Sequence, residues 1–234
     1  MSLRLLLLSN STNHGRGYLE HALPTVLDFF AGARRIGFVP FALQDHAAYV
    51  AKARAPFVAA GMEVEGLTPD ARGLEALHSL DGVFVGGGNT FRLLRALQAS
   101  GLLEEIAARA RAGMPYMGAS AGTNVATPSL KTTNDMPIVQ PARFDALGLV
   151  PFQINPHYID PDPATSHMGE TRDQRIREFH EEDTAPVVGL REGAWLRVDG
   201  PHLTLEGENG AKLFRRGEAP AELAPGRHDA LLGV

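Results

Sequence analysis

Short apolar runs alternate with amphipathic segments through the first half of the chain. A short apolar run that ends at a polar or glycine-rich turn predicts a buried strand, and such runs cover residues 4–8, 35–39, 62–66, 82–85 and 115–118. Apolar residues at helical spacing predict helices over residues 18–30, 47–60, 74–80, 90–98 and 102–112. This β-α-β-α order predicts an α/β fold with a mostly parallel central sheet and helices on both faces.

The pattern changes after Ala126. From Thr127 to Thr165 the chain is rich in Pro, Asn and Asp with little periodicity, which predicts a long loop region of functional importance. A charged helix is expected over residues 170–182. Short apolar runs separated by glycine turns predict antiparallel strands at the C-terminal end of the sheet, at residues 187–190, 194–198, 202–205 and 212–214. No repeat or linker interrupts the chain, so we expect one domain over residues 1–234.

Composition narrows the classes of function. The chain has 234 residues, 44% of them hydrophobic, and a net charge of -5, and without a long Lys/Arg run we expect no nucleic-acid partner. There is no cysteine, which excludes disulfides, thiolate metal ligands and a cysteine nucleophile. No apolar stretch approaches the ~20 residues of a membrane span. The Leu-rich start at residues 3–8 is short for a signal peptide and has no cleavage site, so we expect a cytoplasmic protein without a membrane partner.

The segment Gly118-Ala119-Ser120-Ala121-Gly122 matches G-x-S-x-G directly after a predicted strand. In this motif a strained turn between strand and helix exposes the serine hydroxyl, and small neighbours let the backbone fold tightly. Ser120 is the candidate nucleophile, and the N–H of Ala121 is positioned to stabilise an oxyanion. The alternative is a plain turn of small residues.

A second glycine-rich turn, Gly86-Gly87-Gly88-Asn89-Thr90, ends the preceding predicted strand. Strand ends in parallel sheets meet at one rim, where ligands bind, so Gly88 is a candidate second oxyanion donor. A phosphate-binding loop or a simple tight turn are the alternatives. The P-loop lysine is missing and the spacing is not G-x-G-x-x-G, so nucleotide binding has little support.

A serine nucleophile needs a base, and the chain has nine histidines. His157 is the favoured candidate, because it follows a short apolar strand that ends in Asn155-Pro156. Other histidines in or beside loops stay open, namely His14, His46 and His167. Three histidines in predicted helices are expected at the surface, namely His21, His78 and His180.

The base needs a carboxylate that orients it, and two are in suitable places. Asp135 lies in Thr133-Asn134-Asp135-Met136-Pro137, and Glu192 follows a predicted strand before Gly193. Residue order and spacing do not decide between them. The chain has no H-E-x-x-H motif, and Asp160-Pro161-Asp162 is typical of a solvated loop, so we expect no metal and no cofactor.

Several segments together resemble the aspartyl dipeptidase (peptidase E) family over nearly the whole chain. These are Leu6-Leu7-Leu8-Ser9-Asn10-Ser11, Leu19-Glu20-His21-Ala22-Leu23-Pro24, Val85-Gly86-Gly87-Gly88-Asn89-Thr90-Phe91, Ser120-Ala121-Gly122, Thr132-Thr133-Asn134-Asp135-Met136-Pro137-Ile138-Val139, Gln153-Ile154-Asn155-Pro156-His157, Gly169-Glu170-Thr171-Arg172 and Gln174-Arg175-Ile176-Arg177-Glu178. The stretch between His157 and Gly169 departs most from the family.

The resemblance implies a fold similar to class I glutamine amidotransferases and hydrolysis of small Asp-X peptides. It implies Ser120 as nucleophile and His157 as base, it matches both Asp135 and Glu192, and it assigns Arg172 to the aspartyl carboxylate of the substrate. We expect a monomer or homodimer. The alternatives are another serine hydrolase of the same fold, such as a cyanophycinase-like peptidase, or a non-enzymatic binder of a small ligand.

Overall fold

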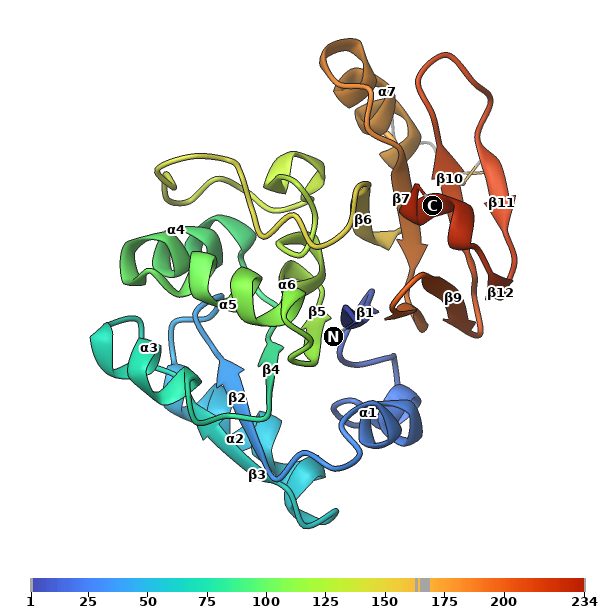
Figure 1. Ribbon diagram of the computed structural model, residues 1–234. Helices are drawn as coiled ribbons and strands as arrows, with labels where there is room; N and C mark the ends of the chain where they lie inside the picture. Colours follow the sequence, from blue (N-terminus) through green and yellow to red (C-terminus); the bar gives the residue numbers. More distant parts are fainter. Residues whose placement is uncertain (1, 163, 165–168, 234) are drawn as a thin grey trace.

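The computed structural model describes residues 2–162, 164 and 169–233. A central eight-stranded sheet has the order β12-β9-β8-β1-β5-β4-β2-β3 (Figure 1). Its parallel part consists of β1 (Arg4–Leu8), β2 (Arg35–Val39), β3 (Glu63–Gly66), β4 (Gly82–Val85) and β5 (Tyr116–Ala119). Its antiparallel part consists of β8 (Ala194–Asp199), β9 (His202–Gly207) and β12 (Gly226–Arg227). The predicted mostly parallel central sheet is confirmed.

Helices cover both faces of this sheet. They are α1 (Leu23–Phe29), α2 (His46–Val58), α3 (Ala71–Leu77), α4 (Thr90–Ser100) and α5 (Leu102–Arg111). The leucines of β1 are fully buried on both sides, because alternate side chains of a strand point to opposite faces. Leu5 and Leu7 pack with α3, α4 and α5, whereas Leu6 and Leu8 pack with α1 and α2. This two-sided core fixes the rim at which β1, β4 and β5 end.

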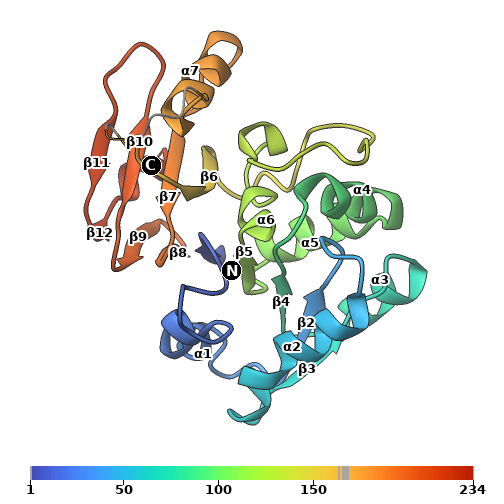
Figure 2. The ribbon, with the colours of Figure 1, turned by 180° about the vertical axis from the view of Figure 1, so that it is seen from behind.

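A separate four-stranded sheet has the order β11-β10-β7-β6. It consists of β6 (Gln153–Tyr158), β7 (Val187–Arg191), β10 (Ala211–Phe214) and β11 (Ala221–Leu223). The strands predicted at 194–198 and 202–205 extend the central sheet as expected, whereas those predicted at 187–190 and 212–214 belong to the second sheet. The chain leaves one sheet for the other at Glu192–Gly193, where Gly193 has φ 79°. The second sheet and α7 (Arg172–Glu182) lie at the end of the molecule away from α2 and α3 (Figure 2).

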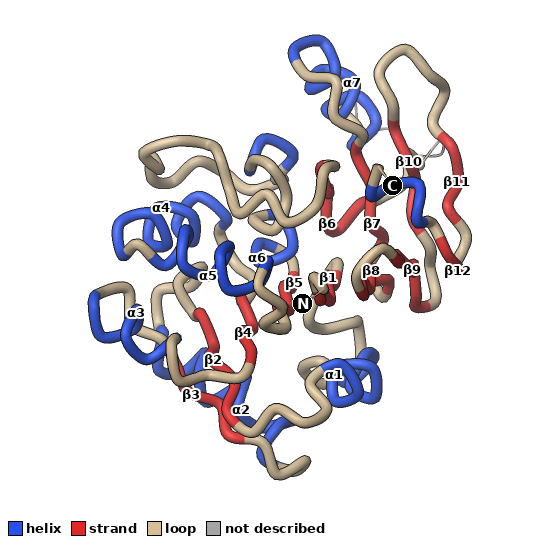
Figure 3. The backbone as a smooth tube through the Cα atoms, viewed as in Figure 1, coloured by secondary structure: helices blue, strands red, loops and turns tan. Residues whose placement is uncertain are grey.

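The helix predicted over residues 18–30 is shorter in the structure. A single 3-10 turn, Glu20–Ala22, precedes α1, which begins at Leu23 with Pro24 in its first turn. Proline lacks an N–H and fits a first helical turn, where that N–H has no partner in the helix. The predicted loop after Ala126 is largely irregular up to β6, apart from the 3-10 turn Leu130–Thr132 (Figure 3).

Two further short helical elements are α6 (Ala121–Asn124) and the 3-10 turn Asp229–Leu232. Among the helices of the described ranges, none has the length and apolar character needed to span a membrane.

Candidate active site

Ser120 lies on a tight turn between β5 and α6. Its backbone has φ 54° and ψ −111°, a conformation that is costly for a residue with a side chain. The Ser120 N–H donates to the Leu8 carbonyl at 3.1 Å, and the Ser120 carbonyl accepts from the N–H groups of Thr123 and Asn124. The turn is therefore held from both sides at the carboxyl end of the sheet, as a nucleophile elbow requires.

The two glycines that flank this turn have no room for a side chain. A Cβ on Gly118 would lie 2.5 Å from the Gly122 carbonyl oxygen, and a Cβ on Gly122 would lie 2.1 Å from the Val85 carbonyl oxygen. The buried Tyr116 hydroxyl donates to the Gly122 carbonyl at 2.6 Å. The glycine spacing around Ser120 thus follows from the close packing of α6 on β4 and β5.

The glycine loop after β4 lies directly against the elbow. A Cβ on Gly87 would be 2.9 Å from the Ser120 Cβ, and Gly88 has φ 129° with the Ala42 carbonyl 2.8 Å from where its Cβ would be. The Gly87 N–H donates to the buried Tyr49 hydroxyl at 2.8 Å. Burial raises the pKa of Tyr49. The backbone predicted to supply an oxyanion donor therefore approaches the nucleophile, with Tyr49 behind it.

His157 is placed by an irregularity in β6. The pairing register of β6 with β7 shifts between Pro156 and Tyr158, and His157 has φ 53°. A bulge of this kind re-aims a side chain and is typical of strands beside active sites. The His157 N–H donates to the Ser9 hydroxyl at 2.9 Å, which donates to the Leu190 carbonyl at 2.8 Å. This bridge fixes the bulge against the end of β1.

His157 joins the serine to a carboxylate. Its Nε2 lies 2.8 Å from Ser120 Oγ, and its Nδ1 lies 2.6 Å from Glu192 Oε1. With the proton on Nδ1, the imidazole donates to Glu192 and accepts from the serine hydroxyl, which is the arrangement of a general base. The Glu192 carbonyl accepts from Asn209 Nδ2 at 2.6 Å. Of the two carboxylates left open by the sequence, Glu192 is the one that contacts the imidazole.

Asp135 has different partners. Its Oδ2 accepts from the Thr90 N–H at 2.7 Å and from the Thr90 hydroxyl at 2.6 Å, at the start of α4. The preceding residue anchors the segment, because Asn134 Nδ2 donates to the Pro156 carbonyl at 2.7 Å. Asp135 thereby lines the same hollow as His157, while its hydrogen bonds go to Thr90.

The hollow above Ser120 has a volume of about 410 Å³, which is within the range of small-ligand sites. Gly88 and Asp135 line it from one side, and Tyr49 and Lys52 of α2 line it from another. The site thus offers an anionic and a cationic side chain near the nucleophile, which suits a small charged ligand.

Arg172 is the first residue of α7 and is half-buried. A capping box fixes this helix start, since the Gln174 N–H donates to the Thr171 hydroxyl at 3.2 Å and the Thr171 N–H donates to Gln174 Oε1 at 2.7 Å. Burial and the neighbouring Arg175 lower the pKa of Arg172, whereas the negative charge of Asp135 raises it. Arg172 lines a second hollow of about 340 Å³, together with Asp160 and Thr171. Arg172 is not among the described residues that line the hollow above Ser120.

The other candidate bases within the described residues do not reach Ser120. Among the described residues, His157 is the histidine within hydrogen-bonding distance of Ser120. His14 and His46 have no such contact, and His167 lies outside the described residues.

The expected surface position of the helical histidines holds for His78 but is wrong for His180. His180 is buried, with its Nε2 3.0 Å from the Ala185 carbonyl. It follows the buried Ile176 by one helical turn and so shares its inward face. His21 is partly buried, and burial lowers its pKa.

Sequence reasoning did not single out Ser9, Tyr49 or Lys52 as residues of the site. Ser9 had a usable signal, because it directly follows the apolar strand β1 at the same rim as Ser120. Tyr49 had none, since nothing in its helix pattern shows which neighbour its hydroxyl meets. Within residues 2–162, 164 and 169–233, no three His, Cys, Asp or Glu side chains are grouped to hold a metal ion.

The family model for peptidase family S51 matches residues 5–206. The chain belongs to peptidase family S51. It is 60% identical to a Streptomyces coelicolor protein named peptidase E, over 96% of this chain and 92% of that protein. It is 50% identical to a Drosophila melanogaster protein named probable alpha-aspartyl dipeptidase, over 94% of this chain and 93% of that protein.

Solved structures agree on the fold of this S51 peptidase. A crystal structure described as a putative peptidase E protein from Listeria monocytogenes has a TM-score of 0.68 at 23% identity, covering 89% of this chain and 100% of that one. A peptidase from an acI-B1 actinobacterium has a TM-score of 0.69 at 15% identity, covering 96% and 95%. These likenesses support the α/β fold with its large, mostly parallel sheet.

Proposed function

We propose that this S51 peptidase hydrolyses dipeptides with an N-terminal aspartate through an acyl-enzyme on Ser120. The main support is the series of hydrogen bonds from Ser120 Oγ through His157 to Glu192. The names of the curated relatives, peptidase E and probable alpha-aspartyl dipeptidase, support the substrate class. The cytoplasmic location expected from the sequence is part of this proposal.

In the acylation step, Ser120 Oγ attacks the carbonyl carbon of the Asp-X bond while His157 Nε2 takes the hydroxyl proton. The N–H groups of Gly88 and Ala121 hold the oxyanion of the tetrahedral intermediate. The C–N bond then breaks, and His157 returns the proton to the leaving amine of X. In the second step His157 Nε2 takes a proton from water as the water oxygen attacks the aspartyl ester. The ester C–O bond then breaks and His157 returns the proton to Ser120 Oγ, which releases free aspartate.

Glu192 is the third member of the proposed triad. Its carboxylate accepts from His157 Nδ1 and stabilises the imidazolium that forms during each proton transfer. Asp135 keeps a role at the site as an anion in the same hollow, and we assign it to the α-ammonium group of the substrate. An N-terminal residue brings this positive charge into the hollow, and the position of Asp135 is fixed by Thr90.

Arg172 is assigned to the aspartyl side chain of the substrate. A guanidinium binds a carboxylate through two parallel hydrogen bonds, and Arg172 is held half-buried at the capped start of α7. Opposite charges at Asp135 and Arg172 match the ammonium and β-carboxylate of an N-terminal aspartate.

The proposal is tested by kcat/KM for Asp-X, Asn-X and Glu-X dipeptides with the same second residue. We expect Asp-X to be preferred, and Arg172→Ala to lower its kcat/KM by about 10²-fold or more because the substrate carboxylate loses its partner. Arg175→Ala is the matched control, since Arg175 lies on the same helix and pairs with Glu170 at 3.4 Å. Full preference for Asp-X in Arg172→Ala would refute the recognition assignment, and cleavage of an Asp-Arg polymer alone would favour the cyanophycinase-like alternative.

A further inference from the structure

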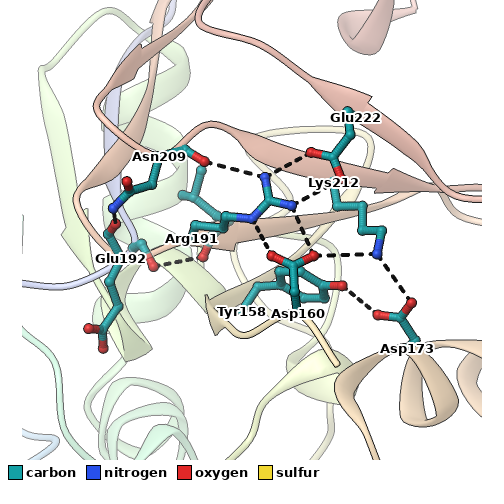
Figure 4. Close-up of polar contacts among 10 residues, drawn as sticks. Tyr158, Asp160, Asp173, Arg191, Glu192, Asn209, Lys212 and Glu222 are labelled. Atoms are coloured by element: carbon teal, nitrogen blue, oxygen red, sulfur yellow. Dashed lines mark hydrogen bonds and ion pairs between the residues drawn. The ribbon is translucent and has the colours of Figure 1, made fainter. Parts of the chain in front are cut away.

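A cluster of polar and charged residues lies on the second sheet and beside it, next to Glu192 (Figure 4). We call Tyr158, Asp160, Asp173, Arg191 and Lys212 the clamp cluster. They come from β6, the residues after it, the start of α7, the end of β7 and β10. The Glu192 carboxylate points away from this cluster in Figure 4. The cluster is therefore a separate structure that adjoins the proposed triad.

Lys212 joins two points that are distant in sequence. Its ammonium lies 3.4 Å from Asp160 Oδ1 and 3.3 Å from Asp173 Oδ2. Only 17% of the Lys212 side chain and 11% of the Asp173 side chain are exposed. A carboxylate at this depth is costly unless a cation pairs with it. Lys212 thus ties the start of α7 and Asp160, two residues after β6, to strand β10.

Arg191 forms a second ion pair with Asp160. Its Nε lies 2.7 Å from Asp160 Oδ2 and its Nη2 lies 3.0 Å from Asp160 Oδ1, the paired geometry that fits a guanidinium to a carboxylate. The Arg191 hydrogen bonds lower the pKa of Asp160. Arg191 also binds Glu222 of β11 at 2.9 Å. Asp160 is therefore fixed to β7 as well as to Lys212.

Tyr158 lies at the centre of the clamp cluster and is 2% exposed. Its hydroxyl donates to Asp173 Oδ1, and the ammonium of Lys212 lies 5.7 Å from its ring centroid. The ring lies flat on β7, where a Cβ on Gly189 would be 2.7 Å from it. Burial and the Asp173 carboxylate raise the pKa of Tyr158, so it stays a hydrogen-bond donor.

Three members of the clamp cluster directly adjoin proposed site residues in sequence. Tyr158 follows His157, Arg191 precedes Glu192, and Asp173 follows Arg172. The cluster and the proposed site therefore share backbone at three places: the end of β6, the end of β7 and the start of α7. Asp173 is held on two sides, by Tyr158 and Lys212, and it is the neighbour of the residue assigned to substrate recognition.

We propose that Lys212 is a specificity-determining positioning residue: by holding Asp160 and Asp173 together it fixes the start of α7, and thereby the position of Arg172. This inference rests on the proposed function. Lys212 touches no substrate and acts through Asp173 and the helix start. The charge of Lys212 is therefore expected to control the preference for an acidic first residue more than the reactivity of Ser120.

The test compares Lys212→Met with wild type. We expect kcat/KM for Asp-X to fall by about 10- to 10²-fold, and the preference over Asn-X to fall with it, because a displaced guanidinium meets the substrate carboxylate poorly. The rate at which phenylmethanesulfonyl fluoride labels Ser120 is expected to change by less than about twofold, since that reagent needs no guanidinium. Lys212→Arg is expected to restore most of the preference.

Arg197→Met is the matched control, because Arg197 is 25% exposed and bridges Asp28 and Asp199 away from the site. It is expected to leave the preference for Asp-X unchanged. A second control is the double variant with Arg172→Ala, in which Lys212→Met should have no further effect on the preference. Additive losses in the double variant, or equal losses in peptide cleavage and Ser120 labelling, would overturn the proposal.

Hydrogen exchange separates this inference from the proposed function. We expect the amides of α7 from Arg175 to Phe179 to exchange faster in Lys212→Met than in wild type or Arg197→Met, whatever the substrate is. Unchanged exchange in α7 would overturn the clamp. Wild-type protein that cleaves Asn-X as fast as Asp-X, with faster exchange in Lys212→Met, would refute the proposed function alone.

Discussion

The central sheet and the second sheet contribute to the candidate site by different means. The central sheet supplies Ser120 and Gly88 through backbone geometry, on turns that exclude side chains at Gly118 and Gly122. The second sheet supplies His157 from β6 and Glu192 from the turn after β7, and α7 beside it supplies Arg172. The side-chain contacts there are hydrogen bonds and ion pairs.

This difference predicts how each part responds to change. Steric exclusion around the elbow does not depend on charge, so that part is sensitive to added volume and insensitive to acid. Ion pairs in the clamp cluster depend on ionised carboxylates and weaken as these are protonated. The proposed nucleophile is thus built into the rigid core, while the residues proposed for orientation and recognition depend on electrostatics.

The largest expected effect concerns the carboxylate behind His157. Glu192→Gln should lower kcat by up to about 10⁴-fold, because the amide no longer stabilises the imidazolium. Labelling of Ser120 by phenylmethanesulfonyl fluoride should slow with it. Asp135→Asn is the comparison variant, and it should lower kcat/KM for Asp-X while slowing the labelling far less. The reverse order of the two labelling rates would make Asp135 the triad member.

The next largest effect concerns the glycine loop after β4, which belongs to the central-sheet part of the site. Tyr49→Phe removes the acceptor of the Gly87 N–H and should lower kcat by up to about 10²-fold with little change in KM, as the loop beside the nucleophile shifts. Tyr18→Phe is the control, because Tyr18 lines the same hollow and packs edge-on against Tyr49 at 6.4 Å between ring centroids. Equal kcat in Tyr49→Phe and wild type would remove Tyr49 from the loop's support.

A smaller effect concerns the strain at the elbow. Ser120→Gly should have a free energy of unfolding about 1 kcal/mol higher than Ser120→Ala, because glycine adopts φ 54° without the side-chain penalty. Chemical denaturation measures both inactive variants. Ala59→Gly, at an exposed position with φ −60°, should instead lose stability. A stability of Ser120→Gly below that of Ser120→Ala would show that the turn is not strained.

The smallest expected effect is the dependence of the clamp cluster's contribution to stability on pH. Arg191 lowers the pKa of Asp160 below its usual 3.8, so their interaction stabilises the fold above that value and is lost as the pH falls through the lowered pKa. Arg191→Met should therefore cost up to about 1 kcal/mol of unfolding free energy at neutral pH, since Asp160 is partly exposed. Well below pH ~4 the difference from wild type should shrink. A difference that is constant with pH would contradict the linkage.

Local patterns predicted the central sheet well. Strand β1 and the Ser120 turn could be located because an apolar run ends at polar or glycine residues there. The second sheet could not be predicted, because the pattern of β7 and β10 shows that they are strands but not which strands they pair with. The switch between sheets depends on the turn at Gly193.

At the site, residue types and motif spacing located Ser120 and His157. The contact between His157 and Glu192 spans 35 residues in sequence, and only the folded arrangement of β6 and β7 brings them together. The clamp cluster had no sequence signal either, since Lys212 and Asp173 are ordinary charged residues until β10 and α7 meet.

The central claim is tested most directly by trapping the acyl-enzyme. Wild type and Glu192→Gln are mixed with an activated aspartyl ester, quenched in acid and analysed by peptide mass mapping. We predict an aspartyl group on Ser120 in both proteins, formed more slowly in Glu192→Gln, and none in Ser120→Ala. Ester turnover with no adduct on Ser120, or with the adduct on another residue, would contradict the account.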